Sequence, residues 1–384
     1  MKAGWQTKTL GNICDILDNR RKPITKCDRK PGPYPYYGAT GILDYVDGYL
    51  FDEPLILVGE DGAKWSSGDN TAFAVEGKCW VNNHAHVLRP HRSVLLDNWL
   101  IHFMVHSDLS EFVSGLTVPK LNQGSLREIS LPVPPLPEQQ RIVTLLDEAF
   151  DGIATAKTNA EKNLQNARAI FESHLQSVFT QRGDGWTNRS LGALAVFRNG
   201  INFTKSSAGE PIKILGVKDF RSSYWAPLEG LETVIPDGTL GNLDMLQRND
   251  LVFVRSNGNP ELIGRCLLVG EVTEKTTHSG FTIRARLSGS DLIPTYLCHF
   301  LKSNLVRREM IDGGNGANIR SLNQGTLSRL VIPVPPTSAQ VQIVAQLEDI
   351  DGETKRLESI YQQKLTALDE LKKSLLHRAF NGDL

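Results

Sequence analysis

The sequence has few cysteines, almost no net charge and no long apolar run. Its five cysteines are an odd number and form no C-x-x-C pair, which argues against a disulfide framework or a zinc knuckle and predicts a reducing, cytoplasmic environment. No stretch approaches the roughly 20 apolar residues that cross a bilayer, and the first residues do not look like a signal peptide, so no membrane partner is expected. A net charge of −1 gives no basic signature for the whole protein, although a local patch can still bind phosphates.

Motifs for nucleotide or cofactor binding are absent as well. The glycine-rich stretch at 312–316 matches neither G-x-G-x-x-G nor a P-loop. The Asn259-Pro260 pair lacks the second proline and the aromatic residue of an amino-methyltransferase motif. The chain itself is therefore expected to hold no nucleotide or S-adenosylmethionine cofactor, and no metal is expected in it.

An internal repeat organises what is present. Three short motifs occur twice in the same order: W-x-x-x-x-L-G at 5–11 and 186–192, LNQG at 121–124 and 322–325, and PVPP at 132–135 and 333–336. The first motif recurs after 181 positions and the other two after 201, so the second copy carries about 20 additional residues between them. The repeat predicts two related globular domains, each followed by a proline turn and a long helix.

Each PVPP motif precedes a long segment whose apolar residues recur three or four positions apart. This period predicts a helix of about 63 Å with one apolar seam. The seam residues are Ile142, Leu146, Ile153, Leu164, Phe171 and Leu175 in the first helix and Ile343, Leu347, Ile350, Leu357, Leu368 and Leu375 in the second. Thr337 or Ser338 is expected to cap the second helix, with Gln340 as capping-box partner. Because neither seam can be buried alone, we expect the helices to pair antiparallel and hold the two domains apart.

The globular parts are expected to mix helices and strands. Residues 55–58 and 251–254 are apolar runs that end in turn residues, as in buried strands, and 80–88 and 276–287 alternate like strands. The predicted fold class is α+β, with two similar mixed α/β domains separated by an antiparallel two-helix coiled coil and related by a pseudo-twofold repeat. The expected boundaries are 1–132 for the first domain, 133–180 for the central helix, 181–333 for the second domain and 334–384 for the final helix.

Several motifs together resemble the specificity (S) subunit of type I restriction–modification systems. They are YYGATG at 36–41, FDEPLILVGEDG at 51–62, LNQG at 121–124, PPLPEQQRIV at 134–143 and LKKSLLHRAFNGDL at 371–384. The resemblance covers the whole chain in the right order, including the repeat. The second helix departs from it, because it opens with PTSAQVQ at 336–342 in place of the family's Pro-Leu-Pro-Glu-Gln-Gln-Arg.

The resemblance implies a function. In that family each globular domain is a target-recognition domain that reads one half of a split, asymmetric site in double-stranded DNA. The helices set the spacing and bind two methyltransferase (M) subunits, to which the restriction (R) subunits attach. S-adenosylmethionine would then belong to the methyltransferase subunits, which methylate adenine, and ATP and Mg to the restriction subunits.

Residues that could touch DNA are basic and amide side chains in turns, since lysine and arginine neutralise phosphates and arginine, asparagine and glutamine pair with base edges. The candidates in the first domain are Arg20, Arg21, Lys22, Lys64, Asn82, Asn83, His84 and Lys120. Those in the second are Lys218, Arg255, Asn257, Asn259, His278, Asn318 and Arg320. Two turns, at 59–62 and 82–86, recur after 196 positions, which favours them as readers.

Other interpretations remain open at this point. His84 and His86 would face one side of a strand and could bind a metal, but no third ligand is evident. Asp61, Glu76 and Lys78 faintly resemble the carboxylate and lysine set of a Mg-dependent nuclease, which would make the chain a stand-alone enzyme. A protein-interaction scaffold that never touches DNA is a third possibility.

Overall fold

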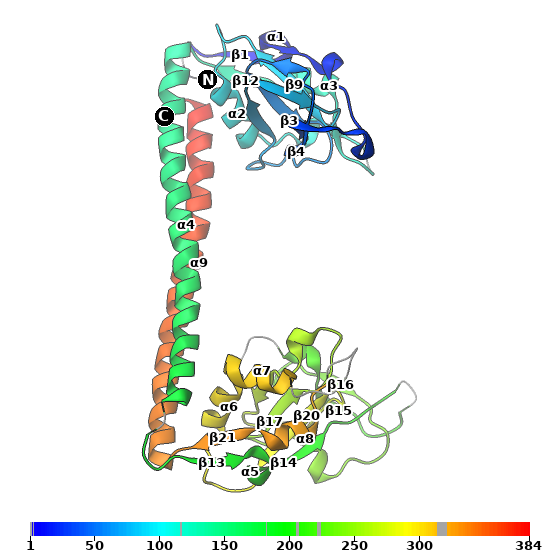
Figure 1. Cartoon of the computed structure of the whole chain (residues 1–384), viewed down its shortest axis with the longest axis vertical. Coiled ribbons are helices and arrows are strands. Elements are labelled where there is room, and N and C mark those ends of the chain that lie inside the picture. Colours follow the sequence, from blue (N-terminus) through cyan, green and yellow to red (C-terminus); the bar gives the residue numbers. More distant parts are fainter. Residues whose placement is uncertain are drawn as a thin grey trace. The chain divides into compact units, whose positions relative to one another are not determined.

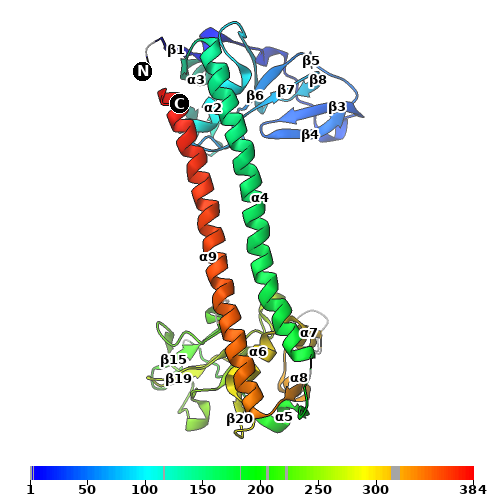
Figure 2. The same ribbon diagram turned by 90° about the vertical axis from the view of Figure 1, so that its left-hand side faces the viewer.

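We describe the protein from a computed structural model, which covers the chain except residues 1, 3, 116, 182, 205, 206, 221–223 and 313–320. Two compact units form, one from residues 1–162 and 362–384 and the other from residues 163–361. Each unit holds one globular domain and a part of each long helix, and each is treated by itself (Figures 1 and 2). Among the described residues, no helix combines the length and the apolar character that crossing a membrane requires.

Two four-stranded sheets form the globular part of unit 1. One is antiparallel, in the order β2-β9-β6-β7, and the other has the order β4-β3-β8-β5 with β3 parallel to β8. The central strand β6 is buried at every position, because its LILVG sequence packs on both faces. The elements before the long helix are β1 Gln6–Thr9, α1 Leu10–Ile13, β2 Cys14–Ile16, η1 Asp18–Arg20, η2 Lys26–Asp28, β3 Pro31–Gly38, β4 Gly41–Val46, β5 Phe51–Asp52, β6 Leu55–Gly59, β7 Ala72–Val75, β8 Lys78–Val81, β9 Ala85–Pro90, α2 Asp97–His106, η3 Ser110–Phe112, β10 Val113–Ser114, β11 Lys120–Leu121, α3 Gln123–Glu128 and β12 Ser130–Val133.

Unit 2 repeats this plan. Its antiparallel sheet has the order β14-β20-β17-β18, and a second sheet has the order β16-β15-β19 with β15 parallel to β19. The elements are β13 Thr187–Ser190, α5 Leu191–Leu194, β14 Ala195–Asn199, β15 Ile212–Leu215, η4 Val217–Asp219, β16 Glu232–Val234, η5 Asn242–Asp244, β17 Leu251–Val254, η6 Pro260–Leu262, β18 Cys266–Leu268, β19 Thr276–His278, β20 Thr282–Leu287, α6 Pro294–Lys302, α7 Asn304–Asp312, α8 Gln324–Arg329 and β21 Val331–Val334.

The repeated motifs occupy equivalent places in the two units. β1 pairs with β12 so that Gln6 lies opposite Val133, and β13 pairs with β21 so that Thr187 lies opposite Val334. These registers reproduce the offsets of 181 and 201 positions that separate the two copies in the sequence. The prediction of two similar mixed α/β domains carrying long helices is confirmed.

A buried glutamine joins each domain to its long helix. Gln139 is fully buried, accepts a hydrogen bond from the Leu96 N–H at 2.9 Å and donates to the carbonyl oxygens of Val94 and Pro134, both at 2.8 Å. Gln340 makes the same three contacts in unit 2, with the Ile293 N–H and the carbonyl oxygens of Asp291 and Pro335. The capping-box prediction for Gln340 is therefore wrong, because its side chain reaches into the domain and not back to the helix start.

The two long helices, α4 Leu136–Thr180 and α9 Thr337–Asn381, run antiparallel within each unit. In unit 1, Arg141 donates to the carbonyl oxygen of Leu384 and the Lys157 ammonium lies 2.7 Å from the Asp369 carboxylate, so advancing along α4 means moving back along α9. In unit 2, Arg168 pairs with Glu358 at 3.2 Å, and Leu175, further along α4, shares a core with the earlier Leu347 of α9.

The seam has two kinds of packing. None of its twelve residues is exposed, and Ile142, Leu146, Ile153, Leu175 and Leu347 are buried. Ile142 and Leu146 belong to the core of the first domain, and Leu175 and Leu347 to that of the second. Between these ends the buried positions include Ala160 and Ala167, whose small side chains let the helices approach closely.

Two predicted strands are each interrupted by a turn. The stretch 80–88 divides into β8 and β9, because the Asn82 side chain accepts a hydrogen bond from the His84 N–H at 2.8 Å and closes a turn. The stretch 276–287 divides in the same way into β19 and β20. His84 and His86 consequently do not share a strand face: His84 lies in the turn with its side chain half exposed, and His86 is buried in β9.

The units differ most in one hairpin. Residues 39 and 40 alone connect β3 to β4 in unit 1, whereas residues 216–231 connect the corresponding strands β15 and β16 in unit 2. Most of the additional residues of the second copy therefore lie in this connection.

Candidate nucleic-acid interface

The strand ends of unit 1 bring several of the predicted DNA contacts into one cluster. Glu60, the first residue after β6, is joined through backbone hydrogen bonds to His84 in the β8–β9 turn and to Leu121 in β11. Lys22 is tied to the same turn, because its N–H donates to the Val81 carbonyl oxygen. Arg21 and Lys120 both bond the Glu60 carboxylate. Segments far apart in the sequence thus meet at the end of β6.

A network of buried charges lies beneath this cluster. His86 is fully buried, with Nδ1 2.6 Å from the Asp18 carboxylate and Nε2 2.7 Å from the Leu121 carbonyl oxygen. These two contacts hold the imidazole ring in place from both sides. Arg21 bonds the Glu60 carboxylate and lies 3.4 Å from Asp18, and the Lys120 ammonium lies 2.7 Å from Glu60.

The network keeps its two acids ionised. Burial by itself would raise the pKa of Asp18, but the hydrogen bonds from His86 and from the Val87 N–H outweigh it and leave the pKa below its ordinary value. For Glu60, hydrogen bonds from Lys120 and Arg21 outweigh burial in the same way, and its pKa is also lowered. Asp18, Glu60 and His86 each offer one atom that could bind a metal ion, and these three atoms lie within 4.8 Å of one another. The cations of Arg21 and Lys120 already bond Glu60, and His86 donates to Asp18, so this cluster is an ion-pair network.

These contacts revise the set of candidate DNA contacts in unit 1. Arg21 is 13% exposed and committed to the network, and Asn82 is 3% exposed and closes a turn, so both drop out as direct contacts. Arg20 is held by Glu53 and lies over the Phe51 ring, although part of its side chain stays exposed. The predicted contacts that remain accessible are Lys22, Lys64, Asn83, His84 and, in part, Lys120.

The geometry does not assemble the nuclease set. Asp61 follows the end of β6 and bonds the His84 ring. Glu76 follows Val75, which pairs with Leu55 at the opposite end of β6. The Lys78 ammonium lies 4.7 Å from the centre of the Tyr49 ring. Two carboxylates at opposite ends of a five-residue strand cannot share one divalent ion.

In unit 2 the predicted contacts lie around the end of β17. Arg255 follows this strand half-buried, and its carbonyl oxygen accepts from the Leu322 N–H as that of Glu60 does from Leu121. The side chains of Asn257 and Asn259 accept from backbone N–H groups two residues ahead, which closes two successive turns. Lys218 is exposed and pairs with Glu232. Asn318 and Arg320 lie outside the described residues.

His278 is a further correction. It is 1% exposed, and its Nδ1 lies 2.9 Å from the Thr282 hydroxyl oxygen inside unit 2. Burial, together with the nearby Arg284 and Arg198 guanidinium groups, lowers its pKa from 6.5 to about 3. A buried, neutral histidine at the start of the β19–β20 turn is part of the core and is removed from the candidate DNA contacts.

We predict a pH dependence of stability from His278. Its pKa is lower in the folded than in the unfolded chain, so the unfolded chain binds the additional proton between pH 6.5 and about 3, and stability falls as the pH falls through that window. Between pH 6.5 and 5 the loss from this one group is roughly 1–2 kcal/mol. In His278→Asn, which keeps a donor toward Thr282, the fall in unfolding free energy measured by urea titration over this range should be smaller by that amount. If the unfolding free energy of both proteins fell equally between pH 6.5 and 5, His278 would not be the group responsible.

The LNQG motif has a structural role that sequence reasoning missed. The Gln123 side chain donates to the Asp18 carboxylate, and the Gln324 side chain donates to Asn199, both at 3.0 Å. The two acceptors lie 181 positions apart, as the first repeated motif does. The motif therefore fixes the chain just after β2 to the start of α3, and the end of β14 to the start of α8.

A basic segment also escaped the sequence analysis, which singled out only its first three residues. Residues 20–30 contain six lysines and arginines and one aspartate. Lys22, Lys26 and Lys30 are exposed, and no ion pair of their ammonium groups occurs among the described residues. Counting charges in a window of about ten residues would have found it.

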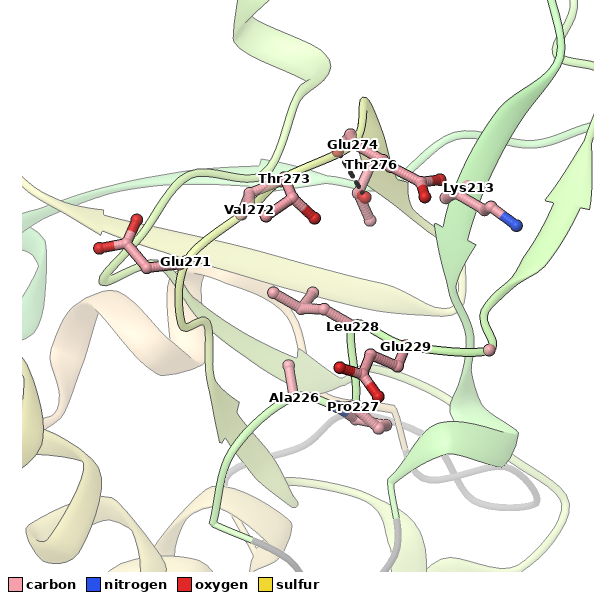
Figure 3. A pocket seen from close by; sticks show the side chains of 11 residues that line it. Lys213, Ala226, Pro227, Leu228, Glu229, Glu271, Val272, Thr273, Glu274 and Thr276 are labelled. Atoms are coloured by element: carbon pink, nitrogen blue, oxygen red, sulfur yellow. Dashed lines mark hydrogen bonds between the residues drawn. The ribbon is translucent and has the colours of Figure 1, made fainter.

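One face of unit 2 carries the opposite charge. A hollow of about 630 Å³ is lined by Glu229, Glu271 and Glu274, with Lys213 as its one basic lining residue (Figure 3). The Glu274 carbonyl oxygen accepts a hydrogen bond from the Thr276 hydroxyl at this wall. Arg248 pairs with Glu271, so Glu229 and Glu274 are the carboxylates that would repel a phosphate at this hollow.

Known proteins share both the sequence pattern and the fold. The family model described as type I restriction modification DNA specificity domain matches residues 2–165 and 263–367, which is more than two thirds of the chain. A putative type I restriction enzyme specificity subunit of Haemophilus influenzae is 25% identical over 378 residues, covering 91% of this chain and 88% of that protein.

Two solved structures have the same fold. The HsdS subunit from Thermoanaerobacter tengcongensis superposes with a TM-score of 0.62 at 16% identity and covers 100% of this chain and 98% of its own. A chain from a study of complex assembly and conformational transition of the type I R-M system gives a TM-score of 0.77 at 15% identity, covering 100% and 99%. At these identities the likeness concerns the fold alone.

Proposed function

The chain belongs to the type I restriction modification DNA specificity family, and from this premise we propose that it is the non-catalytic DNA-recognition subunit of such a complex. Its two units each read one half of a bipartite, asymmetric DNA site. Helices α4 and α9 set the spacing between the half-sites and carry the catalytic subunits. Methylation and cleavage are performed by those partners.

One observation carries the proposal: the two units share their framework and differ in their loops. The β1–β12 and β13–β21 pairings, the buried glutamines and the LNQG contacts repeat, so both units attach to the long helices in the same way. The connection at 216–231 replaces a two-residue turn. The LNQG leucine bonds the carbonyl oxygen of the acidic Glu60 in unit 1 and that of the basic Arg255 in unit 2. Two equivalent supports with different loops suit a site whose halves differ in sequence.

The partners follow from the same reasoning. Two methyltransferase subunits bind the long helices, and restriction subunits join through them. Exposed apolar side chains on these helices, among them Leu145, Ile170 and Ile360, offer contact surface for the methyltransferase subunits. S-adenosylmethionine belongs to those subunits, which take the target adenine out of the base stack, and ATP and Mg belong to the restriction subunits. The assembly works on DNA in the cytoplasm.

Mapping methylated adenines in the host genome, with and without a disrupted gene for this chain, tests the proposal. We expect one split motif with two different halves and a fixed gap, and its loss on disruption. A continuous motif, or an unchanged methylation map, would contradict the proposal. Binding of duplex DNA by the chain with its partners that weakens with rising salt separates this function from a protein-interaction scaffold.

The exposed lysines of unit 1 give a quantitative prediction. Replacing both Lys22 and Lys64 by alanine should weaken binding to all DNA sequences alike and reduce the slope of log K against log salt by about one per lysine. Lys218→Ala is the matched control, because Glu232 already neutralises this ammonium and its removal should change the slope less. A change of sequence preference without a change of slope would assign Lys22 and Lys64 to base contacts.

A further inference from the structure

The β3–β4 hairpin of unit 1 exposes apolar side chains that the domain does not use. Ile42 is 49% exposed, Leu43 53% and Tyr45 52%, although all three belong to the six-residue strand β4. Single exposed apolar residues are common, but three within four positions of a strand form a patch. The hairpin lies at the edge of unit 1, away from α4 and α9 (Figure 2).

The hairpin has a defined shape. Gly38 lies opposite Gly41, so residues 39 and 40 make a tight tip, and Tyr37 lies opposite Ile42. Leu43 lies across Gly38 so closely that a side chain at position 38 would collide with it. The register skips Leu43, which forms a bulge, so that Ile42 lies opposite Tyr37 and Tyr45 opposite Pro35. Ile42 and Tyr45 therefore point to the same face of the ribbon. The exposed side chains are therefore held on a folded two-stranded ribbon.

The basic segment at 20–30 is attached along this ribbon. The Tyr36 hydroxyl accepts from the Ile24 N–H at 3.0 Å, and the Lys30 carbonyl oxygen accepts from the Asp47 N–H at 3.0 Å. The Arg29 guanidinium lies 4.5 Å from the centre of the Tyr36 ring and 3.3 Å from the Asp44 carboxylate. Arg29 thus anchors the segment. The exposed ammonium groups of Lys22, Lys26 and Lys30 lie beside the apolar ribbon.

Apolar side chains beside unpaired cations match the chemistry of duplex DNA. The major groove admits a two-stranded ribbon, and its one apolar feature is the thymine methyl group, while phosphates border it on both sides. We propose that the β3–β4 hairpin enters the major groove of the half-site read by unit 1, where Ile42, Leu43 and Tyr45 contact thymine methyl groups and the three lysines contact phosphates. This inference rests on the proposed function and names the element and base feature that determine one half of its specificity.

The test uses the full chain co-purified with its methyltransferase subunits. Leu43→Ala combined with Tyr45→Ala should relax the methylated motif at A·T positions of one half-site and leave the other half and the gap unchanged. Replacing thymine by deoxyuridine at those positions removes only the methyl group and should weaken binding of the unaltered complex about fivefold to tenfold, while the double variant should be insensitive. Val196→Ala, an exposed aliphatic residue on β14 of unit 2, is the control and should behave like the unaltered complex.

Two results would overturn the inference. A double variant that keeps the complete motif, or unaltered binding to the deoxyuridine site, removes the hairpin as a thymine reader while the split motif itself still supports the proposed function. If the unaltered complex recognises no split site, the proposed function fails first and the hairpin inference fails with it.

Discussion

A heptad inserted into both long helices should lengthen the gap between the two half-sites. Seven residues add about 10 Å to each helix, which equals about three base pairs along the duplex. A helix pair inclined to the DNA axis would transmit less, so we expect a gain of between about one and three base pairs, with both half-site sequences unchanged. Methylome mapping of a strain carrying the altered chain measures this directly.

The insertion points follow from the structure. Residues 162 and 163 of α4, and 361 and 362 of α9, mark the boundary between the two units. Ion pairs on either side, Lys157 with Asp369 and Arg168 with Glu358, stay in register when both helices gain seven residues. A heptad in α4 alone is the control: it moves one set of pairs out of register and should abolish methylation. An unchanged gap in the doubly extended chain would rule out the helices as the spacing element.

Replacing the buried glutamine at either junction should strongly destabilise its own unit. In Gln139→Leu the Leu96 N–H and the carbonyl oxygens of Val94 and Pro134 lose their partners inside the protein. Each unpaired buried group costs about 1–3 kcal/mol, so a loss of roughly 3–5 kcal/mol of unfolding free energy is expected. Gln340→Leu should do the same to unit 2. Hydrogen exchange of the backbone amides, measured at increasing urea concentration, identifies which unit unfolds first.

The chain offers matched controls for both substitutions. Gln140 lies next to the buried Gln139, Gln342 lies two residues after the buried Gln340, and both are exposed. Gln140→Leu and Gln342→Leu should therefore change the unfolding free energy by less than about 0.5 kcal/mol. If Gln139→Leu were as mild as Gln140→Leu, the hydrogen bonds at the junction would not be what holds the domain to its helix.

Local patterns were sufficient to predict the architecture. A repeat of three motifs, a helical period and a proline turn are visible along the chain, so the two domains, the long helices and their antiparallel pairing could be predicted from residues such as Leu146 and Leu347. The family resemblance rested on the order of several motifs, which a single sequence also contains. The turns at Asn82 and after His278 were missed, because each interrupts an alternating pattern typical of a continuous strand.

Candidate DNA contacts were predicted less well, because residue type does not reveal a side chain's partner. Arg21 looks like a surface cation in the sequence, but its guanidinium pairs with Glu60, 39 positions away, in a buried network. His278 resembles a loop histidine and is a core residue. The hairpin patch was missed for the opposite reason, since apolar side chains in β4 are expected to be buried and the sequence contains no sign that Ile42, Leu43 and Tyr45 are about half exposed.

The sequence by itself determined the repeat, the helices and the family, since all three depend on periodicity and on the order of neighbouring residues. The tertiary structure decided which charges are free. Gln123 bonds Asp18 across 105 positions, and Gln139 bonds the chain near Leu96 across 43, so the partners come from segments that only folding brings together. A lysine or arginine is available to bind a phosphate only if no carboxylate of the folded chain pairs with it. That pairing depends on distances in the tertiary structure, which the sequence does not give.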